Sequence, residues 1–197
     1  FLNIDLNYDK RNQRFKANDG FLSKYYVKMP VISTNYSLTT GYDYKLFSEL
    51  YENNISTLGF SLTAASSLNN KDVKLSERLY IPSRKLRGFV RGKVGPKDGE
   101  DYVGGNFVST VNISSTLPHI LSNLQTVDFS IFFDAANVWG VDYDSSIDDA
   151  NKIRSAFGLG VDWFTPIGPL NFSFAQDLSK HSNDKTETFR FNLGTTF

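Results

Sequence analysis

Few residues of this chain could perform covalent chemistry, and they are scattered. The 197 residues include no cysteine and two histidines, His119 and His181. Without cysteine, disulfide frameworks, thiol nucleophiles and cysteine-based zinc sites are excluded. A Ser-His-Asp set can be drawn with either histidine, but neither has a strained nucleophile turn or a nearby orienting acid in the sequence. We therefore predict no catalytic residue, no metal site, no cofactor and no enzymatic activity.

One acidic stretch has the odd-position spacing of a calcium-binding loop. It consists of Asp142, Asp144, Ser146 and Asp148. Such a loop needs glycine where this chain has Ile147, and a bidentate glutamate where it has Ile153. We therefore interpret the stretch as an acidic surface loop.

A basic cluster precedes this stretch. It consists of Arg84, Lys85, Arg87, Arg91, Lys93 and Lys97. Acidic residues follow at once at 98–101, and no aromatic platform for stacking bases accompanies the cluster. The whole chain balances 21 basic against 21 acidic residues, whereas nucleic-acid binders carry a basic excess or face. We expect no nucleic-acid partner and place the cluster in a hydrated loop.

The elements that position these residues are predicted to be β-strands, because apolar residues recur with a period of two almost throughout. Nine such sets occur, at 2–8, 21–29, 38–46, 58–64, 107–113, 127–133, 153–163, 170–174 and 189–197. Many approach the ~9–11 residues that a tilted strand needs to cross a bilayer. No stretch approaches the ~18 uninterrupted apolar residues of a spanning helix.

The composition of the two faces favours a transmembrane β-barrel. The polar positions are rich in small Gly, Ser, Asn and Asp, which suit a hydrated lumen, and aromatic residues lie near strand ends, as in interfacial girdles. Short turns alternate with longer polar loops at 69–104, 140–151 and 179–186, an asymmetry that places the C-terminus on the periplasmic side. A soluble sandwich or lipocalin-like barrel with its apolar face inward is the alternative.

Several segments resemble one family. Residues 76–89 read SERLYIPSRKLRGF, and the chain continues to VGGN at 103–106. FDAANVW at 133–139, GLGVDWFTPIGPLNFSF at 158–174 and FRFNLGTTF at 189–197 follow in order. Together they resemble the BamA family, the outer-membrane β-barrel assembly insertases. The resemblance implies that residues 1–197 are the C-terminal part of a 16-stranded antiparallel barrel domain, with about nine strands, a long inward-folding loop at 69–104, and POTRA domains and early strands absent.

The same resemblance carries the functional expectations. It implies a factor of the Gram-negative cell outer membrane that folds and inserts β-barrel proteins through a lateral seam. Its partners would be the outer-membrane bilayer, unfolded outer-membrane proteins and accessory assembly lipoproteins. A related POTRA transporter that moves proteins through the lumen, and a passive porin-like barrel, are the alternatives.

The resemblance also implies a clamp in the lumen. Leu86, Arg87, Gly88 and Phe89 match the family's loop-six motif, whose arginine pairs with acids on the inner wall. Asp134, on the polar face of its strand, is the expected partner, and a guanidinium suits bidentate binding of a carboxylate. Ser114 stands where the family often has a second acid, which predicts a hydroxyl hydrogen bond in its place.

The terminal strand is the second expected site. In the family this strand meets the first strand at a seam that opens laterally, and a weakly paired edge can template another strand. Gly194 has no side chain to pack, which weakens or bends the strand. The residues that we assign to this seam are Phe189, Phe191, Leu193, Gly194 and Phe197.

Overall fold

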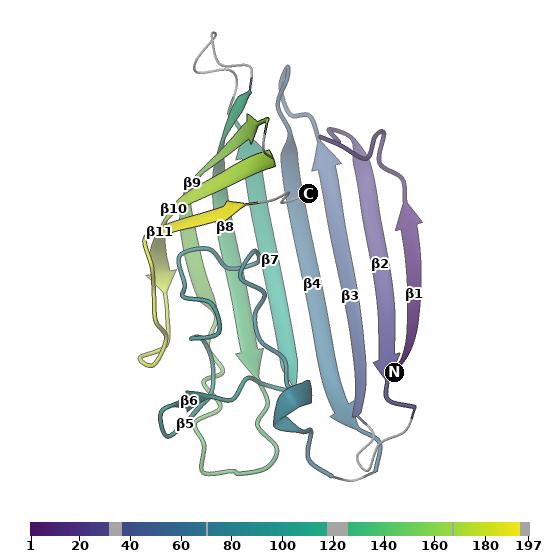
Figure 1. The fold of residues 1–197 in the computed structure, drawn as a ribbon, viewed down its shortest axis with the longest axis vertical. Helices are drawn as coiled ribbons and strands as arrows, with labels where there is room; N and C mark the ends of the chain where they lie inside the picture. Colours follow the sequence, from purple (N-terminus) through teal and green to yellow (C-terminus); the bar gives the residue numbers. More distant parts are fainter. Residues whose placement is uncertain (32–36, 70, 118–125, 167, 194–197) are drawn as a thin grey trace.

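The computed structural model describes residues 1–31, 37–69, 71–117, 126–166 and 168–193. In these residues the chain forms a nine-stranded antiparallel sheet in which every strand pairs with its neighbour along the sheet (Figure 1). The strands are β1 (Leu2–Asp9), β2 (Gly20–Met29), β3 (Ser37–Ser48), β4 (Ser56–Ser67), β7 (Phe107–Thr116), β8 (Val127–Trp139), β9 (Arg154–Thr165), β10 (Gly168–Ser179) and β11 (Phe189–Leu193). Nine strands were predicted, and this prediction is confirmed.

The apolar row of each strand faces outward. On β4, Leu58, Phe60 and Leu62 are exposed, whereas Gly59 and Ser61, on the opposite face, are buried. Exposed leucine, isoleucine, phenylalanine and tyrosine side chains continue this outer face from β1 to β11. The rows therefore do not pack together in a dry centre, so the soluble alternative is wrong.

The segment between β4 and β7 lies against the inner face of the curved sheet (Figure 1). We call residues 69–104 the lumen loop. It contains a short 3-10 helix, η1 (Leu75–Glu77), and a two-stranded ribbon of β5 (Lys97–Asp98) and β6 (Asp101–Tyr102). Leu79 bridges to Gly105 just before β7, which closes the base of the loop. The expected inward-folding loop is therefore present.

No helix in the described ranges is long and apolar enough to cross a membrane.

Candidate functional site

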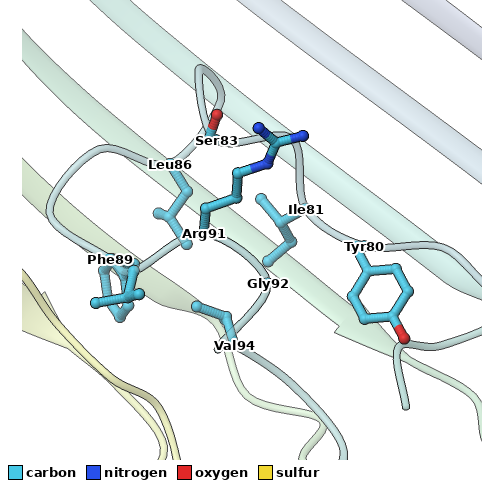
Figure 2. Close-up of a pocket in the computed structure, with 9 residues that line it drawn as sticks. Tyr80, Ile81, Ser83, Leu86, Phe89, Arg91, Gly92 and Val94 are labelled. Carbon is cyan, nitrogen blue, oxygen red and sulfur yellow. The ribbon is translucent and has the colours of Figure 1, made fainter. Parts of the chain in front are cut away.

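Apolar packing attaches the lumen loop to the wall. Four buried apolar side chains of the loop belong to one cluster with the wall: Ile81, Leu86, Phe89 and Val94, which Figure 2 shows gathered in one folded segment. They pack on inner-face residues of β7, β8 and β9, namely Val108, Ala136, Val138 and Ala156. Fully burying one such side chain contributes about 1.5–3 kcal/mol. These four wall residues form an apolar surface on a wall that is otherwise largely polar inside. We call this surface, on which the loop packs, the dry seat.

Arg87 and Asp134 form a bidentate ion pair beside this seat. The Nε of Arg87 lies 2.7 Å from Oδ2 of Asp134, and its Nη2 lies 2.8 Å from Oδ1. The backbone N–H of Arg87 also donates to Oδ2, at 3.0 Å. The side chain of Asp134 is fully buried, whereas that of Arg87 is 23% exposed. The geometry fixes both the loop backbone and its guanidinium on β8.

The guanidinium of Arg87 also stacks on an aromatic ring. Its carbon lies 3.5 Å from the ring centroid of Phe132 on β8. Phe132 in turn lies over Gly158 of β9, where an added Cβ would stand 2.6 Å from the ring and 2.1 Å from the carbonyl oxygen of Phe174. The close approach of these groups therefore requires glycine at 158.

Asn112 is the second wall residue of the clamp, and the sequence did not single it out. It pairs across the β7–β8 ladder with Asp134, so both side chains share one face. Its Nδ2 donates to Oδ1 of Asp134 and to the carbonyl oxygen of Lys85, each at 2.8 Å. Ser114, expected in this role, shares a 2.7 Å hydrogen bond with Thr57 of β4 instead. The expectation for Ser114 was one inward-facing position too far along β7.

A second buried ion pair, at the first residue of β9, joins the lumen loop to the β10–β11 connection. Arg154 Nε lies 2.9 Å from Oδ2 of Asp184, and both side chains are fully buried. Arg154 also donates to Asn137, and Asp184 accepts the backbone N–H of Gly95 in the lumen loop, at 3.0 Å. The sequence analysis missed this pair. Its only signal was an arginine on the small, polar face of β9.

Asp142 ties the base of the lumen loop to the β8–β9 connection. Its Oδ2 accepts the backbone N–H of Val73 and the Nδ2 of Asn106, each at 2.9 Å, and Arg78 pairs with its Oδ1. Burial by itself raises the pKa of Asp142, but the hydrogen bonds from Val73 and Asn106 and the charge of Arg78 lower the pKa below its ordinary value. This carboxylate is a structural tie.

The other members of the acidic stretch have separate roles. Asp144 accepts the backbone N–H of Ser146, and Asp148 accepts that of Ala150 and pairs with His181. Across the described ranges, acidic and histidine side chains do not gather in any group of three or more that could hold a metal ion.

The terminal strand β11 presents Phe189, Phe191 and Leu193 outward, all three exposed. Phe172 on β10 contacts both aromatic rings, with centroids 6.4 Å from Phe189 and 5.2 Å from Phe191. The remaining seam residues, Gly194 and Phe197, lie outside the described residues.

A wall with an apolar outer face, and a loop clamped to its inner face, defines part of a transmembrane β-barrel. The chain belongs to the Omp85 superfamily, since residues 1–197 match the Omp85 superfamily domain. This membership agrees with the resemblance found in the sequence.

Individual relatives support the same assignment. The chain is 32% identical over 155 residues to the outer membrane protein assembly factor BamA of Neisseria meningitidis, a match covering 64% of this chain and 19% of the relative. It is 30% identical over 153 residues to a SAM50-like protein of Schizosaccharomyces pombe, covering 72% of this chain and 31% of that one. The chain thus spans about a fifth to a third of these relatives.

A solved structure matches the fold. The crystal structure of BamA from Haemophilus ducreyi lacking POTRA domains 1–3 superimposes with a TM-score of 0.87 at 24% identity, over 96% of this chain and 41% of that one. At this identity the likeness concerns the fold.

Proposed function

We propose that the protein is an outer-membrane protein assembly factor, which folds and inserts β-barrel proteins through a lateral seam. Residues 1–197 would be the C-terminal part of its barrel domain, located in the cell outer membrane with the C-terminus facing the periplasm. Its partners would be the bilayer, unfolded outer-membrane proteins and accessory assembly lipoproteins. The Neisseria meningitidis relative described above is named an outer membrane protein assembly factor.

The physical reason for such a factor is the cost of bare backbone in lipid. A strand that enters hydrocarbon unpaired leaves polar groups unsatisfied, at several kcal/mol each. A protein that lends a strand edge supplies the missing partners through main-chain hydrogen bonds. This activity breaks no covalent bond of the client, so it calls for no catalytic residue.

The observation that carries the proposal is the clamp of Arg87 on Asp134 inside a lipid-facing wall. We infer that it holds the lumen loop so that the wall beside the terminal strand keeps its shape while the seam opens. Leu86 and Phe89 anchor the same motif in the dry seat. Gly88 has a φ of +86°, which favours glycine. A Cβ added there would lie 3.1 Å from the Cβ atoms of Ala156 and Ala175, so the motif requires glycine at this position.

The test is insertion of an unfolded outer-membrane β-barrel protein into liposomes that contain the full-length protein, followed by the gel shift of the folded client. The protein should accelerate client folding. Arg87→Ala should reduce the acceleration, barrel stability and growth, because Asp134 is left buried without its charged partner.

The control is Arg91→Ala, which removes an exposed arginine from the same loop. Normal growth and unchanged heat-modifiability of Arg87→Ala would contradict the role of the clamp. Conductance without client insertion would favour a porin-like barrel, and release of the client across the membrane would favour a transporter.

A further inference from the structure

The lumen loop pairs through its backbone with the segment that leads into the terminal strand. Phe89 forms an antiparallel bridge with Thr186. The backbone N–H of Val90 donates to the carbonyl oxygen of Lys185 at 2.9 Å. The backbone N–H of Lys185 donates to the carbonyl oxygen of Lys93 at 3.0 Å. Residues 185–187 therefore form an added ladder with the loop, just before β11.

The chain changes its pairing partner at Thr188. β11 pairs with β10 from Phe189 to Leu193, and the carbonyl oxygen of Thr188 still accepts the N–H of Ala175. One residue earlier, the N–H of Glu187 donates to Gly88 of the loop instead, at 3.0 Å. One end of the terminal strand is thus attached to the loop and the rest to the wall.

Arg190 spans this change of partner. It lies on the inner face of β11, and its side chain is 12% exposed. Its Nε lies 2.5 Å from Oε1 of Glu187, while its two Nη groups donate to the carbonyl oxygens of Ser83 and Phe89. Ser83 and Phe89 flank the segment that carries Arg87. One guanidinium therefore joins the terminal strand to the loop backbone on both sides of Arg87.

We propose that Arg190 is a positioning residue, which couples the terminal strand to the lumen loop and so fixes one end of β11 while the seam opens. This inference rests on the proposed function. The loop is itself held on β8 by Asp134, so Arg190 adds a second connection between β11 and the wall, besides the pairing of β11 with β10. Hydrogen bonds from a charged group are stronger than neutral ones, which suits a contact that must persist while neighbouring strands separate.

A disulfide can replace this coupling and test it. Val90 and Lys185 are next in register to the bridge between Phe89 and Thr186, so their side chains lie near each other. Residues 1–197 contain no cysteine, so Val90→Cys with Lys185→Cys introduces one defined pair here, and any cysteine elsewhere in the full-length protein is first replaced by serine. Disulfide formation is measured with and without Arg190→Ala in the full-length protein in liposomes, alongside client folding.

We expect Arg190→Ala to slow both disulfide formation and client folding about tenfold, as expected for the loss of hydrogen bonds to a charged group. The preformed disulfide should restore client folding in the Arg190→Ala variant. Arg91→Ala, which removes an exposed loop arginine, should change neither rate. Should Arg190→Ala fail to fold by heat-modifiability, Arg190→Gln, which keeps an amide donor without the charge, takes its place.

Two results would overturn the proposal: equal disulfide rates with and without Arg190, or a folding defect that the disulfide leaves unrepaired. A parent protein that inserts no client would refute the proposed function instead. In that case the disulfide rates still decide whether Arg190 couples the strand to the loop.

Discussion

The two halves of the sheet have the same outer face and different inner faces. On β1–β4 the inner side chains are mostly polar and partly hydrated, as in the Lys24–Asp5 pair, whose side chains are 40% and 49% exposed. On β7–β11 the lumen loop covers the wall, and Asp134, Arg154 and Asp184 are fully buried in ion pairs. The outer face meets the same solvent, lipid, along the whole sheet, so its pattern is uniform.

This difference shows that the lumen loop excludes water from the inner face of one half of the wall and packs against it. Val138 and Ala156, completely buried under the loop, lie in register with Thr63 and Gly59 of β4 through the intervening strands. The same kind of substitution should therefore lower the free energy of unfolding strongly in the loop-covered half and only slightly in the open half. The following predictions test this contrast, from the largest expected effect to the smallest.

The largest effect is expected for Asp184→Ala. It leaves the guanidinium of Arg154 buried without its charged partner, which costs about 3–5 kcal/mol. Asp5→Ala removes an exposed pair and should cost less than about 1 kcal/mol. The free energy of unfolding, measured in urea with lipid vesicles and tryptophan fluorescence, checks both values. Equal losses would contradict the contrast.

The next effect is expected for Leu86→Ala in the dry seat of the loop. Removal of this buried side chain leaves a cavity and should cost about 2–5 kcal/mol. Leu62→Ala on β4 changes a half-exposed, outward residue and should cost much less. The same urea titration compares the two. A loss at Leu62 as large as that at Leu86 would show that the seat is not tightly packed.

A smaller effect is expected for Gly158→Ala. The added Cβ would lie 2.6 Å from the ring of Phe132 and 2.1 Å from the carbonyl oxygen of Phe174 on β10, closer than van der Waals contact, so the strands must shift, at about 1–3 kcal/mol. Gly59 on β4 is the matched control, since its nearest neighbour would lie 3.6 Å away, and Gly59→Ala should stay within about 0.5 kcal/mol. A neutral Gly158→Ala would mean that the ring of Phe132 relocates freely.

The smallest effect concerns acid pH. The pKa of Asp142 is lowered from 3.8, so its ionised form stabilises the folded state above that pH, and the contribution is lost as the pH falls through the folded value. The urea midpoint of the protein should exceed that of Asp142→Asn at about pH 6, and the gap should shrink below the ordinary pKa. A gap that does not change with pH would refute the ionic tie to Arg78.

The strands were predictable, because alternation reports directly which side chains share a surface, and the small polar side chains of one face favoured the apolar face as the outer one. The lumen loop and the placing of Arg87 with Asp134 came from the resemblance, since nothing local in the sequence joins positions 87 and 134. Asn112 was missed because its role depends on register. The β7–β8 ladder sets Asn112, not Ser114, opposite Asp134.

The remaining contacts could not be predicted, because they join loops that meet only after the sheet has formed. Asp184 is 30 residues from Arg154 and 89 from Gly95. Arg190 is 107 residues from Ser83. In sequence these residues are ordinary charged positions at loops or on a polar face, and such positions are most often solvated.

The sequence by itself determined the strands, the lipid-facing side and the absence of thiol chemistry, because periodicity and composition are local properties. The tertiary structure alone decided which inner positions are dry and which charges are paired. That outcome depends on where the lumen loop folds back, and hence on which distant groups lose water together.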